Sequence, residues 1–283
     1  MRTLKRKRAR ASACYLGAAL LLLLTALPFG PVSSRAKRAF YAAAPPDTAG
    51  GGVSVERVEL RGEDYVLFGR YLGEPILWQV IASDGGCPLL FSEYVLCLKA
   101  FAADEKPNEA SSDWHSSALR QWLNCAQTRV QWDGAPPGAA NLYGGHNGYA
   151  DEPGFLSEGN FSGQEAALIK RNGDAVFLLT KKQLRKLPAA RRRKALTKAA
   201  RGQDDSPYWF IRPYCWYWTA DPIATNAQSV CSVTTKGSFY KSLAADGLNG
   251  VCPALYLVSD TVDSAGGDGS RAAPYQLVGR KQP

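Results

Sequence analysis

The chain has 283 residues, of which 46% are hydrophobic and 21% charged, a composition typical of a folded globular protein and not of a disordered or fibrous one. Its formal net charge is +9, but nine of the 34 basic residues lie within positions 1–38, where there is no acidic residue. The remaining 25 basic residues equal the 25 acidic ones, so the rest of the chain is formally neutral. This distribution excludes the broadly basic face of a nucleic-acid-binding protein, and no nucleic-acid partner is expected.

The N-terminus has the pattern of a membrane-targeting segment. Residues 1–10 form a basic n-region with six cations, and residues 11–34 are uncharged, with their most apolar part at 14–27. This apolar part is shorter than the roughly 20 residues of a full span, which favours a cleaved signal peptide. The basic excess before it also fits a retained signal anchor with its N-terminus inside. Both alternatives predict an extracytoplasmic protein, either secreted or anchored in the membrane by a single N-terminal helix.

The folded part is expected to follow a linker. Residues 35–52 contain many Ala, Pro and Gly residues, a composition typical of a linker. The sequence therefore predicts one ectodomain at 53–283.

Cysteine usage agrees with export. Beyond the leader the number of cysteines is even, which predicts up to three disulfides in one of fifteen possible pairings. No pair has the CxxC spacing of a thiolate metal site, and neither a metal nor another cofactor is predicted. The alternative is that some of the six are buried free thiols. They are Cys87, Cys97, Cys125, Cys215, Cys231 and Cys252.

Hydrophobic periodicity predicts a mixture of strands and short helices. Alternating or short apolar runs bounded by turn residues predict strands at 53–60, 65–71, 76–82, 89–92, 175–180, 228–233, 239–243 and 251–258. The first four follow one another closely, as in an antiparallel meander. Apolar residues at three- and four-residue spacing predict a helix at 117–126. Ser162 and Glu165 form a capping-box pattern before a second helix at 162–169.

Two further segments carry candidate ligand-binding residues. The Gly-, Pro- and Asn-rich excursion 133–154 contains His146 and Tyr149, and long structured loops often carry function. The segment 208–218 holds seven aromatic residues. Its members Tyr214, Trp216 and Trp218 are predicted to form a stacking platform for a sugar ring or another flat apolar group, with ordinary packing as the alternative.

Residues 181–201 carry ten basic residues and no acidic one. They are predicted to form a basic helix that is interrupted at Pro188. The four consecutive cations of this segment are expected to meet an anionic envelope polymer or lipid headgroups. The alternative is a solvated helix face whose charge is balanced by the acidic remainder of the domain. These cations are Arg191, Arg192, Arg193 and Lys194.

The order of several short phrases resembles the DUF6273 family of uncharacterised, mostly exported bacterial domains. The phrases are DWHSSALRQWLN, NFSGQEAALI, SPYWFIRP, NGVCPALYL and GGDGSRAAPYQL, and the resemblance covers 66–277. It implies an α+β fold similar to C-type lectin-like and formylglycine-generating-enzyme domains, with twisted antiparallel sheets, two short helices and long loops after the N-terminal apolar leader helix. It implies no established activity. The family's usual Arg before Pro-Ala-Leu is Cys252 here, so a disulfide is expected to replace an Arg contact.

These patterns predict a non-catalytic extracytoplasmic recognition domain for a glycan, a peptide or another cell-envelope component. No catalytic residue is predicted, because two histidines alone make neither a zinc site nor a catalytic triad. The paired loop and strand motifs that hold calcium in sugar-binding lectins are not intact. The alternatives are an oxidase or hydrolase on a formylglycine-generating-enzyme-like fold, and a structural envelope protein.

Overall fold

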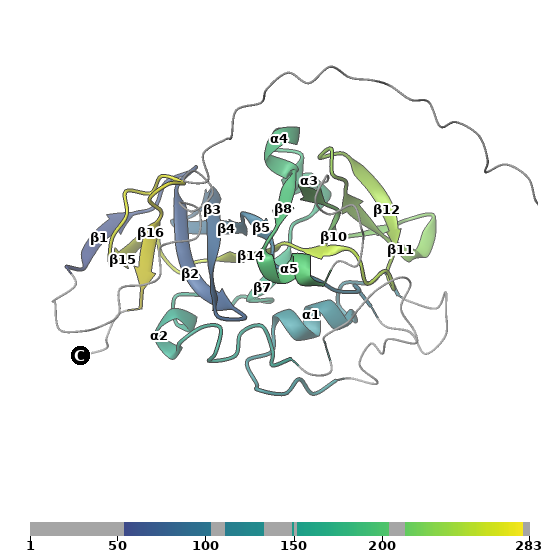
Figure 1. The fold of residues 1–283 in the computed structure, drawn as a ribbon, viewed down its shortest axis with the longest axis horizontal. Coiled ribbons are helices and arrows are strands. Elements are labelled where there is room, and N and C mark those ends of the chain that lie inside the picture. The colour runs from purple at the N-terminus through teal and green to yellow at the C-terminus, as the bar shows by residue number, and fades with distance from the viewer. Residues whose placement is uncertain (1–53, 103–110, 133–148, 150–151, 204–212, 280–283) are drawn as a thin grey trace, which may run out of the picture. The chain divides into compact units, whose positions relative to one another are not determined.

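The structure, a computed structural model, describes residues 54–102, 111–132, 149, 152–203 and 213–279 (Figure 1). By its contacts the chain divides into two units, Met1–Gly52 and Val53–Pro283, and all described residues belong to the second. The predicted leader, the linker and the candidate ligand residue His146 lie outside the described residues. Within the described ranges, no helix is both long enough and apolar enough to span a membrane.

The largest sheet has eight strands in the spatial order β1-β15-β16-β2-β3-β4-β14-β7. Neighbouring strands are antiparallel except β16 and β2, which are parallel. The consecutive pairing of β2, β3 and β4 confirms the predicted meander, whereas β1 pairs with β15 from the other end of the domain. The strands are β1 (Glu56–Glu59), β2 (Tyr65–Tyr71), β3 (Glu74–Asp84), β4 (Cys87–Ser92), β7 (Val176–Leu178), β14 (Pro253–Tyr256), β15 (Thr261–Ser264) and β16 (Tyr275–Val278).

Two smaller sheets complete the strands that the structure describes. One has five strands in the order β12-β11-β10-β13-β6, and the other has three in the order β5-β8-β9. Since β12 ends the five-stranded sheet, it is an edge strand, visible on the right of Figure 1. The strands are β5 (Tyr94–Val95), β6 (Cys97–Leu98), β8 (Lys194–Leu196), β9 (Tyr214–Cys215), β10 (Tyr217–Ile223), β11 (Asn226–Val233), β12 (Phe239–Leu243) and β13 (Gly250–Val251).

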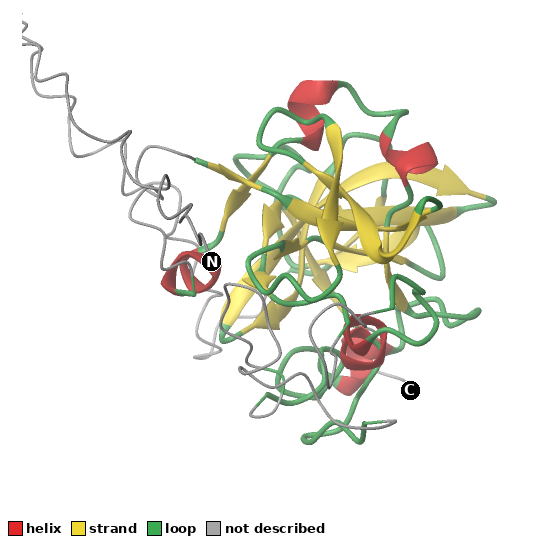
Figure 2. Ribbon diagram, turned by 90° about the vertical axis from the view of Figure 1, so that its right-hand side faces the viewer, coloured by secondary structure: helices red, strands yellow, loops and turns green. Residues whose placement is uncertain are grey.

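The helices of the described residues are short and lie around the strands (Figure 2). They are α1 (Ala118–Leu123), α2 (Gly163–Ala166), α3 (Lys181–Leu184), α4 (Ala189–Arg192) and α5 (Lys198–Gly202). Both predicted helices are present, since the Ser117 side chain caps α1 and a capping box between Ser162 and Glu165 opens α2. The structure is thus a β-rich α+β fold.

The prediction of a basic helix over 181–201 is wrong. The chain forms α3, α4 and α5 there, with strand β8 between the last two. Pro188 precedes α4 as its N-cap, because proline offers no N–H to continue the preceding helix. Arg193 is then extended, with ψ 121°, and leads into β8, which pairs with β5 and β9. Sheet pairing with distant segments therefore overrides the helical composition.

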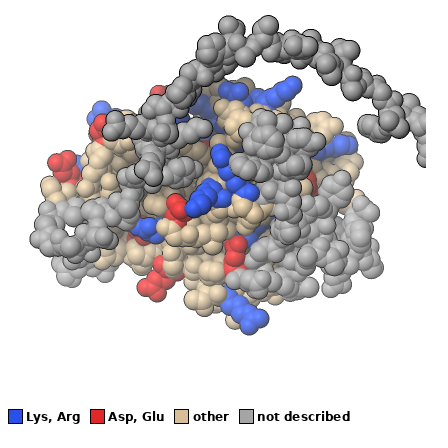
Figure 3. All heavy atoms as spheres, in the orientation of Figure 1, with Lys and Arg blue, Asp and Glu red and all other residues tan. Residues whose placement is uncertain are grey.

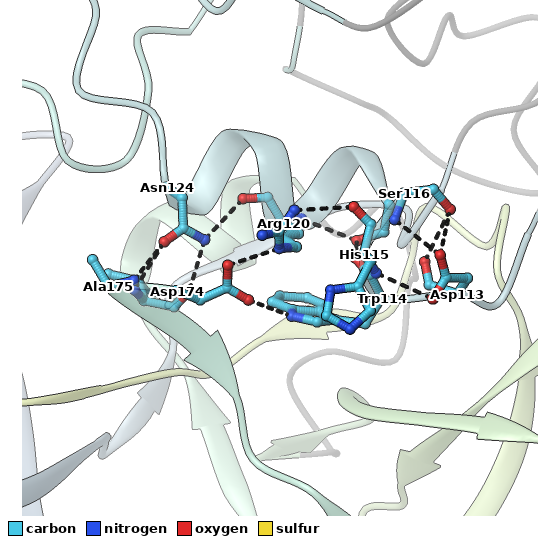
Figure 4. A network of polar contacts seen from close by, with 10 residues as sticks. Asp113, Trp114, His115, Ser116, Arg120, Asn124, Asp174 and Ala175 are labelled. Atoms are coloured by element: carbon cyan, nitrogen blue, oxygen red, sulfur yellow. Dashed lines mark hydrogen bonds and ion pairs between the residues drawn. The ribbon is translucent and has the colours of Figure 1, made fainter. Parts of the chain in front are cut away.

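The polar residues around α1 attach this helix to β7 (Figure 4). The Asp174 carboxylate accepts the Nε–H of Arg120 and the Nε1–H of Trp114, both at 2.7 Å. The Asn124 side chain accepts the backbone N–H of Ala175 at 2.8 Å. These polar side chains thus join α1 to β7 of the eight-stranded sheet.

We expect Gly69→Ala to destabilise the protein much more than Gly73→Ala. Both glycines have positive φ, +67° and +81°, a conformation that costs roughly 1–2 kcal/mol for a residue with a Cβ. At Gly69 the added Cβ would also lie 2.2 Å from the buried Phe161 ring, whereas at Gly73 nothing lies within 4 Å. Overpacking adds about 1–3 kcal/mol. Urea unfolding of both variants measures the difference, and equal losses would contradict this account of the packing.

Candidate functional site

Three cations converge on one aromatic ring at the edge of the five-stranded sheet. The Nζ of Lys181 and the Cζ atoms of Arg185 and Arg192 lie 5.5, 5.9 and 5.2 Å from the centre of the Phe239 ring. Phe239 is half-buried at the start of β12, and the cations come from α3 and α4. We call these four residues the Phe239 cluster. Each cation above a ring face at this range contributes about 0.5–1 kcal/mol at exposed sites.

Local structure fixes the two cations of α3. Thr180 and Gln183 form a capping box, so the helix begins at Lys181. The backbone N–H of Lys181 also donates to Asp221 Oδ2 at 2.6 Å, which ties the helix start to β10. Lys181 and Arg185 are four residues apart and therefore project from the same side of the turn, over Phe239.

The third cation is held by hydrogen bonds. The Nε–H of Arg192 donates to the carbonyl of Gly237 at 2.7 Å, and its Nη1 donates to the carbonyl of Leu187 at 2.5 Å. Gly237 has φ +76°, and a Cβ there would lie 2.3 Å from the carbonyl oxygen of Ala189. This close approach of the turn before β12 to α4 needs a glycine and places Arg192 against Phe239.

Within the part of the chain that the structure describes, the side chains of the Phe239 cluster form no ion pair, although the Asp221 carboxylate accepts the backbone N–H of Lys181. Among the described residues, none of its three cations has a carboxylate within ion-pair distance. Like charges about 8 Å apart repel by roughly 0.5 kcal/mol in water and by more near a protein surface. An anion placed among them would remove this repulsion, so the arrangement favours a carboxylate or phosphate group.

Cations and aromatic rings also meet beside this cluster. The Cζ of exposed Arg193 lies 4.7 Å from the Tyr214 ring centre, which joins two predicted site residues. The ring of half-exposed Trp216 makes an edge contact with Tyr240, which is 58% exposed. Figure 3 shows lysine and arginine side chains gathered in the upper part of the view, where α3 and α4 lie in Figure 1. Tyr214 and Trp216 thus remain candidates for ligand contact.

No family model matches the chain, and neither a curated protein nor a solved structure does.

Two of the predicted ligand-binding aromatics belong to the core. Trp218 is 1% exposed, and its Nε1–H donates to the carbonyl of Lys99 at 2.8 Å. Tyr149 is equally buried, and its hydroxyl donates to the carbonyl of Ala100 at 2.7 Å. A ligand cannot reach side chains that are enclosed in this way, so the prediction is wrong for both.

The four consecutive cations separate in the structure. Arg191 pairs with Glu63 at 2.8 Å, whereas Arg192 joins the Phe239 cluster. Lys194 is 1% exposed, lies 4.3 Å from the Phe91 ring and pairs with Glu93 at 3.5 Å. Burial lowers its pKa, against the opposing effect of Glu93. Lys194 therefore cannot meet an anionic surface as predicted.

The structure does not form the predicted disulfides. Five of the six cysteines are free thiols, and the sixth, Cys215, packs against the same hydrophobic cluster as Cys252. Burial raises the pKa of Cys97 to about 12 and also raises the pKa of Cys231 and Cys252. Because the thiolate is the reactive form, these three thiols are poor nucleophiles at neutral pH. The five free thiols are Cys87, Cys97, Cys125, Cys231 and Cys252.

A buried ion pair that the sequence analysis did not identify lies behind the five-stranded sheet. Lys99 is fully buried, and its Nζ lies 3.0 Å from Glu152 Oε2 and between the rings of Trp122 and Tyr149, at 4.7 and 4.6 Å. The Tyr71 hydroxyl donates to the same carboxylate oxygen at 3.0 Å. No local pattern indicates this pair, because Lys99 and Glu152 lie far apart along the chain.

We expect the thiols of Cys97, Cys231 and Cys252 to resist alkylation in the folded protein and to react after unfolding without any reductant. The reason is that burial and raised pKa values keep them neutral and inaccessible in the native state. Iodoacetamide labelling followed by peptide mass spectrometry measures the outcome. If the unfolded chain reacts at these positions only after reduction, they are paired in disulfides, which would contradict this prediction.

Proposed function

We propose that the chain is a non-catalytic, extracytoplasmic recognition domain that binds an anionic partner through the Phe239 cluster. One observation carries the proposal: three cations from two helices meet over a single half-buried ring, with no carboxylate paired to them among the described residues. Such a site combines an apolar surface with positive charge. It suits a partner that presents carboxylate or phosphate groups next to flat or apolar groups.

Three titratable groups of the described core are unsuited to catalysis at neutral pH. Burial raises the pKa of the Tyr71 hydroxyl and of the Cys97 and Cys252 thiols, which keeps all three neutral near pH 7. All three side chains are at most 5% exposed. A nucleophile or general base needs an accessible site and a pKa near the working pH, and these groups meet neither condition.

The proposed location rests on the sequence of the leader. Its basic start and apolar core are typical of export, with the protein either secreted or anchored in the membrane. The free thiols of Cys97, Cys231 and Cys252 are compatible with an oxidising exterior, because neutral thiols enclosed in a core are not available for exchange, whereas Cys87 and Cys125 are only partly buried.

We also propose that the fold is of the C-type lectin-like kind that the DUF6273 resemblance implies. Support comes from its antiparallel strand pairs, from the two capped helices α1 and α2, and from long connections between short elements. This proposal concerns the fold alone, since folds of this kind carry many functions.

We expect the double variant Lys181→Gln/Arg185→Gln to bind dextran sulfate about 30-fold more weakly than the unchanged protein. Each cation near an anionic surface contributes roughly 1 kcal/mol, and two such losses correspond to about a 30-fold change in affinity. Binding should also weaken steeply with added salt. Isothermal titration calorimetry at several salt concentrations measures both effects.

The matched control is Lys182→Gln/Lys186→Gln, which removes the same charge from exposed residues in and next to the same helix. Among the described residues, only Lys181, Arg185 and Arg192 lie over the Phe239 ring, so the control should lose much less affinity. Equal losses of dextran sulfate affinity in the two variants would show that binding depends on overall positive charge and not on the Phe239 cluster. Absence of any salt-sensitive binding would favour the structural envelope role instead.

A further inference from the structure

The edge strand β12 combines unpaired backbone groups with exposed apolar side chains and positive charge. Tyr240 is 58% exposed and Leu243 is 40% exposed, and both lie on β12. No described strand pairs with the outer side of β12. Such an edge is a template onto which another extended chain can add through its outward N–H and C=O groups, although the carbonyl of Leu243 already accepts the N–H of Asp246 at 2.9 Å.

The register of β11 and β12 identifies which backbone groups point outward. The N–H of Thr234 donates to the carbonyl of Ser238, and that of Ala244 donates to the carbonyl of Gln228. In an antiparallel ladder, hydrogen-bonded pairs alternate with non-hydrogen-bonded ones. Tyr240 and Ser242 therefore bond to β11, opposite Ser232 and Val230. The N–H groups of the alternate residues point away from the sheet, and these residues are Phe239, Lys241 and Leu243.

The side chains of these same alternate residues lie on one face, and that face is positively charged. The cationic groups of Lys181 and Arg185 lie over the Phe239 ring, and Lys241 is exposed two residues further on. Side chains on an added strand would project beside them, because strands lie about 4.8 Å apart and alternate in the same way. Opposite charges at such cross-strand positions are favourable, and like charges are not.

We propose that β12 binds an extended peptide strand of a partner protein that carries acidic side chains at every second position. This inference rests on the proposed function: the anionic partner of the Phe239 cluster would be a peptide. Backbone hydrogen bonds to Phe239 and Lys241 supply the strand addition, and alternate carboxylates meet Lys241 and the cations of α3. The remaining side chains of the peptide face the exposed ring of Tyr240.

A second copy of this chain is a poorer occupant of the same edge. Two β12 strands from two copies can pair antiparallel in the register that sets Phe239 of one copy opposite Leu243 of the other. This register places Lys241 of one copy directly opposite Lys241 of the other. Two like charges at that position are destabilising, whereas a carboxylate there is stabilising. Charge complementarity therefore selects an acidic strand.

Substitution at Lys241 separates strand addition from charge attraction. Lys241→Pro removes both the charge and the outward N–H, whereas Lys241→Ala removes the charge alone. Proline is tolerated on an edge strand where its missing N–H faces away from the sheet. We expect a peptide of alternating Glu and Val to bind Lys241→Pro at least tenfold more weakly than Lys241→Ala, measured by fluorescence anisotropy. Both variants should bind dextran sulfate equally.

Amide hydrogen exchange of the unsubstituted protein tests the same inference without any change in sequence. In the free protein the N–H groups of Phe239, Lys241 and Leu243 should exchange fast, and the peptide should slow them. Those of Tyr240 and Ser242 should exchange slowly in both states. A peptide of the same sequence with an N-methylated backbone should not bind.

Equal peptide affinity of Lys241→Pro and Lys241→Ala, or unchanged exchange at Lys241 in the bound protein, would overturn strand addition. If Lys181→Gln/Arg185→Gln still weakened dextran sulfate binding in that case, the proposed anion recognition would stand. If neither probe bound, both proposals would fail together. The two failures are therefore distinguishable.

Discussion

The outward direction of Arg193 depends on the burial of the neighbouring ammonium group, that of Lys194. Its Nζ is enclosed by the Phe91 ring at 4.3 Å and paired with Glu93 at 3.5 Å, and Glu93 also pairs with Arg271 at 2.9 Å. Removing a charge from water costs several kcal/mol, which only a paired carboxylate and a fitted site can offset. Because Lys194 points inward in extended chain, Arg193 before it points outward, onto Tyr214.

The positive charge on β12 that favours an acidic strand also disfavours pairing between the β12 edges of two copies of the chain. Exposed edge strands with apolar side chains tend to pair with one another, and proteins commonly limit this with charged residues, especially lysine. Lys241 lies at the middle of β12, between the exposed Tyr240 and the buried Ser242. One lysine thus disfavours self-association and leaves the edge available to a chain of opposite charge. Under the proposed strand addition, Lys241 therefore acts both in binding and against self-association.

Local patterns in the sequence predicted the helix caps and part of the strands, because alternation and capping involve residues close in the chain; the predicted strands correspond to β1 to β4, β7 and β11 to β14. They did not predict β8, since Lys194–Leu196 pairs with β5 from about a hundred residues earlier. They also could not tell which side of a strand a ring occupies: Trp218 is buried and Trp216 is not. Phe239 was predicted only as a strand residue, because the cations that meet it precede it by about fifty positions.

The buried ammonium groups of Lys99 and Lys194 have the same kind of surroundings, which offset the cost of removing their charge from water. Each pairs with a carboxylate, Glu152 or Glu93, and each lies against aromatic rings. Buried ion pairs give little net stability compared with apolar replacements, but a charge left without its partner is costly, so they favour one arrangement over others. We infer that these pairs fix how β6 and β8 sit in their sheets.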